Sequence, residues 1–253
     1  MISIKSPREI ELMRIAGRIV AETHELLSEV IRPGITTLEL DAIAEAFIVK
    51  SGGIPAFKGY NGFPASICSS VNEQVVHGIP GTTVLKDGDV IGIDIGVIYG
   101  GYYGDAARSY GIGNISDEKE KLIKVTKESF FKGIEYALVG NRLSDISHNI
   151  QKHVESNGFS VVRDFVGHGI GSSMHEEPQI PNYGLPNKGP RLAAGMTLAI
   201  EPMVNIGKYA VKVLKDGWTV VTADGKPSAH YENTIVITGE KPEILTLLQD
   251  VER

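Results

Sequence analysis

Apolar positions in the first fifty residues recur at the three- and four-residue spacing of amphipathic helices. The segment SPRE at residues 6–9 combines a serine cap, a proline at the first helical position and a glutamate that closes a capping box. A helix is therefore expected from there to about Ile31, before Pro33 and Gly34. A second cap, TTLE at residues 36–39, begins an apolar pattern that predicts a helix towards residues 52–53.

The pattern changes between about Ser66 and Gly113, where Val, Ile and Tyr are abundant and Gly-Ile-Pro-Gly and Asp-Gly turns interrupt them. This stretch, which contains the apolar run VIGIDIGVIYGG, is typical of strands. The order then repeats, with helical patterns over about 116–138 and 143–157. Strand-like segments follow at 159–165, 196–204, 210–214, 218–223 and 231–238.

Two rounds of helix, helix and strands, with no Ser/Pro/Gly-rich linker between them, predict an α+β fold. We expect a single catalytic domain that spans 1–253 and is built from two related halves, about 1–113 and 114–253. Such halves would leave a cleft between their two sheets.

Composition narrows the function classes. The 253 residues are 42% hydrophobic and carry a formal net charge of −6, without any Lys/Arg-rich run, which argues against nucleic-acid binding. Cys68 is the only cysteine, as expected in a reducing compartment. The N-terminal segment has charges throughout and no apolar stretch long enough for a signal peptide or membrane span. A cytoplasmic protein that contacts no membrane is expected.

Four acidic residues interrupt apolar strand patterns. Asp94 lies within IGIDIGV, and Asp105 follows a Gly-Gly turn on what reads as the returning strand of a hairpin, so both carboxylates could reach one spot. Glu201 in LAIEPMV and Glu232 in HYENTIVIT repeat this feature. Any one of them could be satisfied by backbone amides or by an arginine, such as Arg108 for Asp105.

The four acids together favour a metal centre. Like charges within a few ångströms cannot all stay ionised without cations among them, and two divalent ions would neutralise the set. An added imidazole, such as that of His168, shifts the preference from Mg or Ca towards Mn, Fe, Co or Zn.

Glycine-rich settings distinguish three of the seven histidines. His168 and His175 lie in GHGIGSSMHEEP, an irregular Gly/Ser stretch where backbone can approach a ligand closely, and His77 lies in VVHGIPG. Surface or core roles are favoured for the others, which are His24, His148, His153 and His230.

These residues resemble a known family. The set Asp94, Asp105, His168, Glu201 and Glu232, with the surrounding segments GHGIG, MHEEP, LAIEPM and YENTIVIT, is similar to type I methionine aminopeptidases in their short bacterial-like form. VNEQVVHGIP, LKDGDVIGIDIGV and KDGWTVVT extend the resemblance over nearly the whole chain. It implies the pita-bread (creatinase/aminopeptidase) fold, with pseudo-symmetric halves around a central dinuclear metal cleft.

The resemblance also implies a role for each site residue. Asp94 would chelate one divalent ion, Asp105 and Glu232 would bridge two, and His168 with Glu201 would complete the second site. The ions would activate a water, Glu201 would exchange its proton, and the substrate's free amine would bind near Asp94. His77 and His175 would contact the scissile amide and the oxyanion.

The implied activity is removal of the initiator methionine from nascent polypeptides at the ribosome, by a protein expected to be monomeric. Family positions that line the methionine pocket correspond to Phe57, Tyr60, Asn61, Phe63, Cys68, Met174 and Trp218. This chain departs from the expected pattern at three of them. A smaller residue is expected at Phe57, a histidine at Asn61 and an aromatic residue at Met174, which bears on the dimensions of the pocket.

Two rival functions remain open at the level of sequence. Xaa-Pro aminopeptidases and prolidases share the metal ligands and a HEEP-like segment, but they usually carry an additional N-terminal domain and lack the VHGIP and DGWTVVT segments found here. A catalytically silent pita-bread module that binds peptides is the other alternative. Such a module would be expected to have lost at least one of the five ligands, and all five are present.

Overall fold

Four helices form where capping and periodicity predicted them. The computed structural model describes residues 2–248. Ser6 and Thr36 each form a capping box at the start of a helix. The first of these helices ends just before Ile31 and the second just before Ser51. The third helix ends four residues short of the expected Leu138. The helices are α1 (Pro7–Val30), α2 (Thr37–Lys50), α3 (Asp117–Ile134) and α4 (Leu143–Ser156), with a 3-10 turn, η1 (Tyr60–Gly62).

The N-terminal sheet is organised around one long antiparallel hairpin. Strand β4 (Val90–Tyr99) pairs along its full length with β5 (Tyr102–Gly111) across the Gly-Gly turn. On its other edge β4 pairs with β1 (Ile54–Pro55) and then with β2 (Ile67–Val71). This hairpin confirms the expected returning strand, and β1 is an addition to the expected elements.

The C-terminal sheet is built from shorter strands. Its five antiparallel strands follow the order β15-β14-β9-β7-β8. They are β7 (Gly167–Gly169), β8 (Glu176–Ile180), β9 (Thr197–Ile200), β14 (Asn233–Val236) and β15 (Glu243–Ile244). Two small sheets, in the orders β13-β10-β6 and β11-β12-β3, extend the structure. Their strands are β3 (Gln74–Val76), β6 (Ser160–Val161), β10 (Met203–Asn205), β11 (Val211–Val213), β12 (Val220–Thr222) and β13 (Ser228–His230).

Several strand expectations need correction. The segment 196–204 is two strands, β9 and β10, because Pro202 has no amide hydrogen to continue the ladder. The segment 159–165 contributes only the two residues of β6, and 231–238 only the four of β14. The stretch around His168, expected to be irregular, contains β7.

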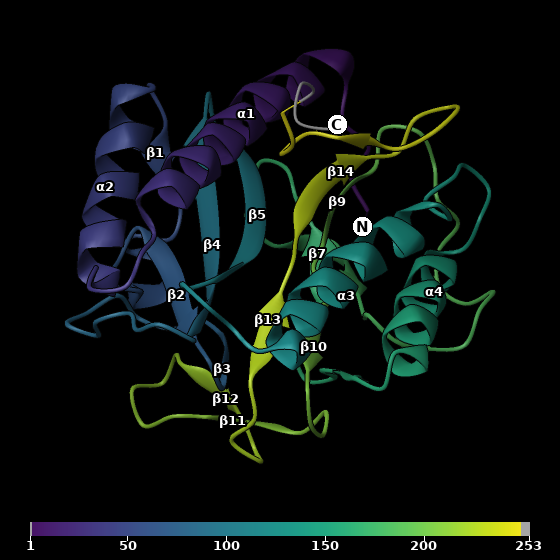
Figure 1. Cartoon of the computed structure of the whole chain (residues 1–253). Coiled ribbons are helices and arrows are strands. Elements are labelled where there is room, and N and C mark those ends of the chain that lie inside the picture. The colour runs from purple at the N-terminus through teal and green to yellow at the C-terminus, as the bar shows by residue number, and fades with distance from the viewer. Residues whose placement is uncertain (1, 249–253) are drawn as a thin grey trace.

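The two main sheets meet at β5 and β14. The amide of Asp105 donates to Oγ1 of Thr234, whose hydroxyl donates to the Asp105 carbonyl, and the Glu232 amide donates to the Ala107 carbonyl. Apolar residues of α1, α2 and β4 form one core cluster, and those of α3, α4, β9 and β14 form another. Helices therefore cover the outer face of each sheet (Figure 1), and the inner faces are left to build a site.

Within residues 2–248, none of the helices combines the length and the apolar composition that a membrane span requires.

Candidate metal centre and active site

A cavity of about 180 Å³ lies where the inner faces of the two sheets meet. Its wall is polar at one end and mainly apolar at the other. Every site residue predicted from the sequence contributes to it. The lining residues are Phe57, Tyr60, Asn61, Phe63, Cys68, His77, Asp94, Asp105, His168, Met174, His175, Glu201, Trp218 and Glu232.

The register of the β4–β5 hairpin brings the two aspartates together. Asp105 lies opposite Gly96, and Gly96 is two residues from Asp94, so both side chains leave the same face of the sheet. The alternate positions of β4, including Ile93 and Ile95, face the helices and are fully buried in the N-terminal core. Alternation along one strand thus separates the core from the site.

The C-terminal sheet supplies His168, Glu201 and Glu232. His168 is the middle residue of β7, while Glu201 directly follows β9 and Glu232 directly precedes β14. The two glutamates therefore lie at strand ends rather than within strands as expected. A bulge follows His168, and Gly169 is required there because a Cβ atom would lie 2.2 Å from the Glu177 carbonyl oxygen.

The five predicted ligands converge without neutralising one another. His168 Nε2 lies 3.5 Å from Glu201 Oε1 and 4.0 Å from Asp105 Oδ2. One carboxylate oxygen of Asp94, one of Asp105 and one of Glu232 are buried and have no hydrogen-bond partner among the described residues. Unpaired buried acceptors are costly, so a group that satisfies them is expected.

Burial raises the pKa of every acid in the cluster, and neighbouring carboxylates raise it further for Asp105, Glu201 and Glu232. Burial raises the pKa of Asp94 to about 7. Burial, together with the charges of Glu232 and Asp94, raises the pKa of Asp105 well above its ordinary value. Burial and neighbouring carboxylates do the same for Glu201 and Glu232. Burial lowers the pKa of His168 to about 4, which leaves a neutral imidazole suited to metal binding.

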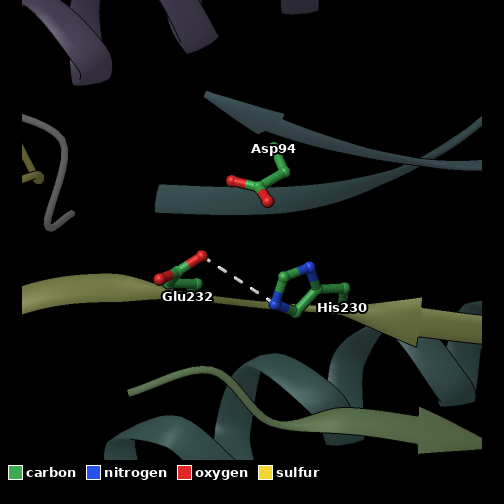
Figure 2. Close-up of side chains that lie close together, drawn as sticks. All are labelled: Asp94, His230 and Glu232. Atoms are coloured by element: carbon green, nitrogen blue, oxygen red, sulfur yellow. Dashed lines mark ion pairs between the residues drawn. The ribbon is translucent and has the colours of Figure 1, made fainter. Parts of the chain in front are cut away.

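This donor set fits divalent cations. Asp105, His168 and Glu232 each offer one ligand atom within 4.8 Å of the others, and Asp94, His230 and Glu232 do the same. Figure 2 shows the second group, with Asp94 facing Glu232 and His230 across the junction of the sheets. Hard carboxylate oxygens combined with imidazole nitrogens suit Mn, Fe, Co or Zn. Positive charge here would satisfy the unpaired oxygens and lower the raised carboxyl pKa values.

Two expectations about neighbouring residues change. Arg108 does not neutralise Asp105, because its guanidinium donates to the carbonyl oxygens of Ala107 and Glu232 and to Asn233 Oδ1. His230, for which a core or surface role was favoured, is buried as a core residue is, and it also lies beside the carboxylate cluster, with Nε2 3.7 Å from Glu201 Oε2. Its position two residues before Glu232 was the available sequence signal.

Two further histidines border the polar end. The Tyr60 hydroxyl lies 2.7 Å from His175 Nδ1, and burial lowers the pKa of His175, so a neutral ring is favoured. A hydroxyl that donates to Nδ1 leaves the ring proton on Nε2. His77 has a φ of 59°, a left-handed conformation that histidine adopts more readily than most side chains. Its ring contacts Phe165 edge-on, with 5.7 Å between centroids.

The other end of the cavity is apolar. Phe63 and Trp218 pack edge to face, with 5.1 Å between ring centroids. Phe57 and Met174 lie against Gly96, where a Cβ atom would be 2.6 Å from the Phe57 ring and 2.9 Å from the Met174 methyl. Cys68 lies opposite Asp94 on β2, and burial raises the pKa of its thiol, so it contributes a small neutral surface.

Comparisons with known proteins agree with this geometry. The model of metallopeptidase family M24 matches residues 11–239. The chain belongs to metallopeptidase family M24. Within this family it is 65% identical to a methionine aminopeptidase of Clostridium perfringens, over 98% of this chain and 100% of the relative. It is 63% identical to methionine aminopeptidase 1 of Bacillus subtilis, over 97% and 99% of the two chains.

Solved structures of M24 proteins confirm the pita-bread fold. The methionine aminopeptidase of Thermotoga maritima superimposes with a TM-score of 0.97 at 49% identity, over 98% of this chain and all of that one. The prolidase of Pyrococcus furiosus gives a TM-score of 0.78 at 22% identity, over 97% of this chain but 66% of that one, and shows the fold alone. Membership of a metallopeptidase family implies the use of divalent metal.

Proposed function

We propose that this M24 enzyme removes the N-terminal initiator methionine from newly made polypeptides whose second residue is small. The observation that carries the proposal is the division of one cavity into two ends. One end is formed by an imidazole and by carboxylates, three of which have a buried oxygen without a hydrogen-bond partner among residues 2–248, and apolar side chains form the other end. High identity to methionine aminopeptidases over nearly the full chain supports methionine as the side chain bound.

Five residues would hold two divalent ions. Asp94 would bind one, His168 and Glu201 the other, and Asp105 with Glu232 would bridge them, in keeping with the two overlapping donor groups that share Glu232. When bound, such ions lower the pKa of a water into the neutral range and polarise the scissile carbonyl. Candidates are Mn, Fe, Co and Zn, whose relative availability decides which is used.

Glu201 is the proposed proton carrier. Its carboxyl group is largely enclosed, and burial beside Asp94 and Asp105 raises its pKa. Positive charge at the cluster would bring that pKa back towards neutrality, where a carboxylate both accepts and returns a proton efficiently. Glu201 would take the proton of the attacking water and deliver it to the leaving amine.

His175 and His77 would act on the scissile peptide. With Tyr60 bonded to Nδ1, the Nε2–H of His175 is free to donate a hydrogen bond to the oxygen that becomes negative during attack. His77 borders the same cavity and would contact the amide from the other side. Burial lowers the pKa of His77 to about 4, so it would act as a neutral ring.

The apolar end would select the side chain. Tyr60, Phe63, Cys68 and Trp218, with Phe57 and Met174, would enclose the thioether of methionine. A single methylene is worth only about 1–3 kcal/mol in such a pocket, so discrimination depends on close packing. A cavity of about 180 Å³ suits one side chain and favours an enzyme that trims a terminal residue.

The biological setting follows from the substrate. Nascent chains are made in the cytosol, so the enzyme would act there, on polypeptide N-termini that emerge from the ribosome. The single cysteine accords with a reducing compartment. We expect a monomer, with one catalytic domain whose two related halves, about 1–113 and 114–253, meet at the metal centre.

The test begins with chelator-treated protein. Mn, Fe, Co or Zn is added back in turn, and cleavage of Met-Ala-Ser, Leu-Ala-Ser and an Xaa-Pro peptide is compared. Metal-dependent release of methionine, with little release from Leu-Ala-Ser, is expected. Glu201→Gln, which keeps the size of the side chain but cannot carry the proton, is the matched inactive control.

Other outcomes have defined meanings. Preferential cleavage of the Xaa-Pro peptide would transfer the chain to the proline-specific branch of the family. A protein that binds metal but cleaves none of the peptides would make the silent peptide-binding module the better account.

A further inference from the structure

His230 is a buried imidazole to which the proposed mechanism gives no role. It is the last residue of β13, and only 3% of its surface is exposed. Its Nε2 atom is fully enclosed and has no hydrogen-bond partner among residues 2–248. An imidazole nitrogen in that state is costly unless something else satisfies it.

The backbone around His230 fixes the direction of the ring. His230 pairs with Met203 of β10. Its backbone is also held by Ser109, because the His230 amide donates to Ser109 Oγ and the same hydroxyl donates to the His230 carbonyl. Two residues on, Glu232 leaves the chain on the same side. In Figure 2 both side chains point towards Asp94 on the opposing strand, and a dashed line joins His230 to Glu232.

The distances suit a shared cation better than hydrogen bonds. His230 Nε2 lies 3.9 Å from Glu232 Oε2, beyond ordinary hydrogen-bond reach, and a ligand atom of Asp94 lies within 4.8 Å of both. Two donor atoms that each lie about 2.1 Å from one ion are separated by about 3–4 Å. His168, the predicted imidazole ligand, has nearly the same spacing from its carboxylates, at 3.5 and 4.0 Å.

The two imidazoles also divide between the two donor groups. His168 belongs with Asp105 and Glu232, and His230 belongs with Asp94 and Glu232. Without His230, the Asp94 side of the centre would have carboxylate donors only. With it, each side has one nitrogen donor, which raises affinity for Fe, Co and Zn relative to Mg or Ca.

We propose that His230 is a sixth protein ligand of the metal centre and gives its Nε2 lone pair to the ion held by Asp94 and Glu232. The inference rests on the proposed dinuclear centre and adds a donor to it. It also makes the two ions more alike in their ligands than the five-residue set alone would. Its removal should weaken one of two binding events and leave the other nearly unchanged.

The direct test is X-ray absorption on the wild-type protein loaded with two equivalents of Co(II). The inference predicts two imidazole scatterers per two ions, whereas the five-residue set predicts one. Because this measurement uses the unaltered chain, it holds even if a substitution at His230 prevents folding. A count of one imidazole would overturn the inference.

Substitution provides a second readout. In His230→Gln, Co(II) titration by calorimetry should show one site weakened by about 100-fold or more, because even residues that only orient a ligand are worth about 10–100-fold. His148→Gln is the matched control, since His148 bonds the Gly184 carbonyl and lies outside the cavity. Two unchanged affinities in a folded His230→Gln protein would contradict the proposal.

The outcomes also separate this inference from the proposed function. A wild-type protein that binds two ions and releases methionine, but carries one imidazole, would refute only the role of His230. A wild-type protein that takes up no metal would refute the dinuclear centre and, with it, both proposals.

Discussion

The two ends of the cavity differ in how they affect the stability of the fold. At the polar end, buried oxygens of Asp94, Asp105 and Glu232 have no hydrogen-bond partner within the described part of the chain, and the carboxyl pKa values are raised. At the apolar end, Phe63 and Trp218 pack as an ordinary core does. The polar end therefore lowers the stability of the metal-free fold but provides the groups needed for catalysis. The apolar end contributes both stability and selectivity. Substitutions at the two ends should accordingly affect different measured quantities.

The largest effect is expected at Asp105. Asp105→Asn removes a proposed bridging charge, and loss of several kcal/mol of metal assistance corresponds to a fall of about 10³-fold or more in kcat. Metal content should fall as well. Urea unfolding of the chelated proteins should show no loss of stability, because the variant lacks a buried carboxyl group that repels Glu232. Full metal content together with full activity in Asp105→Asn would contradict the proposed role of Asp105 as a metal ligand at the polar end.

His175 should affect the rate without affecting metal content. His175→Ala removes a proposed oxyanion donor, for which a loss of about 10²–10³-fold in kcat is expected. Tyr60→Phe keeps the ring of His175 but removes the hydroxyl on Nδ1, so its loss should be smaller. Peptide hydrolysis and metal analysis on the same samples make the measurement. Reduced metal content in His175→Ala would instead assign this histidine to the metal centre.

A substitution at Gly96 tests whether close packing at the apolar end sets the size of the pocket. In Gly96→Ala the added methyl would press on the Phe57 ring and the Met174 methyl and push them into the cavity. Overpacking of about 1–3 kcal/mol predicts a rise of about tenfold in KM for Met-Ala-Ser, with a smaller change in kcat. Gly92→Ala is the control on the same face of β4, since its methyl would meet nothing closer than 3.6 Å. Equal KM values for the two variants would show that Gly96 does not set the pocket.

The smallest effect is expected far from the cavity. Glu9 accepts hydrogen bonds from the Tyr102 hydroxyl and the Ser6 amide, which lower its pKa from 4.5 to about 2. Because the folded-state pKa is depressed, the stabilisation is present above about pH 4.5 and is lost as pH falls towards 2. Glu9→Gln should lower Tm by roughly 2–4 °C at neutral pH, with activity unchanged. Thermal unfolding of both proteins across this pH range should show the difference shrinking in acid.

The sequence predicted the N-terminal part of the site better than the C-terminal part. Asp94 and Asp105 flank one turn, so local pairing alone sets their register and face. Glu201 and Glu232 lie just outside the short strands β9 and β14, and Pro202 follows Glu201 directly, so strand alternation does not set their direction. Their identity as candidate ligands came from sequence, but their positions depend on how β9 and β14 pack.

Long-range packing explains what was missed. His230 is two residues before Glu232, but its place in the cluster depends on pairing with β10 and on the approach of β4, which are contacts between distant parts of the chain. The strands β1, β8 and β15 were missed because each is short; β1 is also held by a partner distant in the chain, β4. The first two helices, in contrast, carry their own caps and were predicted to within a residue or two.

The most direct test of the polar end is a metal titration in which bound ions and methionine release are measured on the same chelated sample. We expect no release of methionine at the start, a rise as ions bind, and saturation by two equivalents per chain. Release that persists in the fully chelated protein, or two tightly bound ions with no release of methionine, would contradict this expectation.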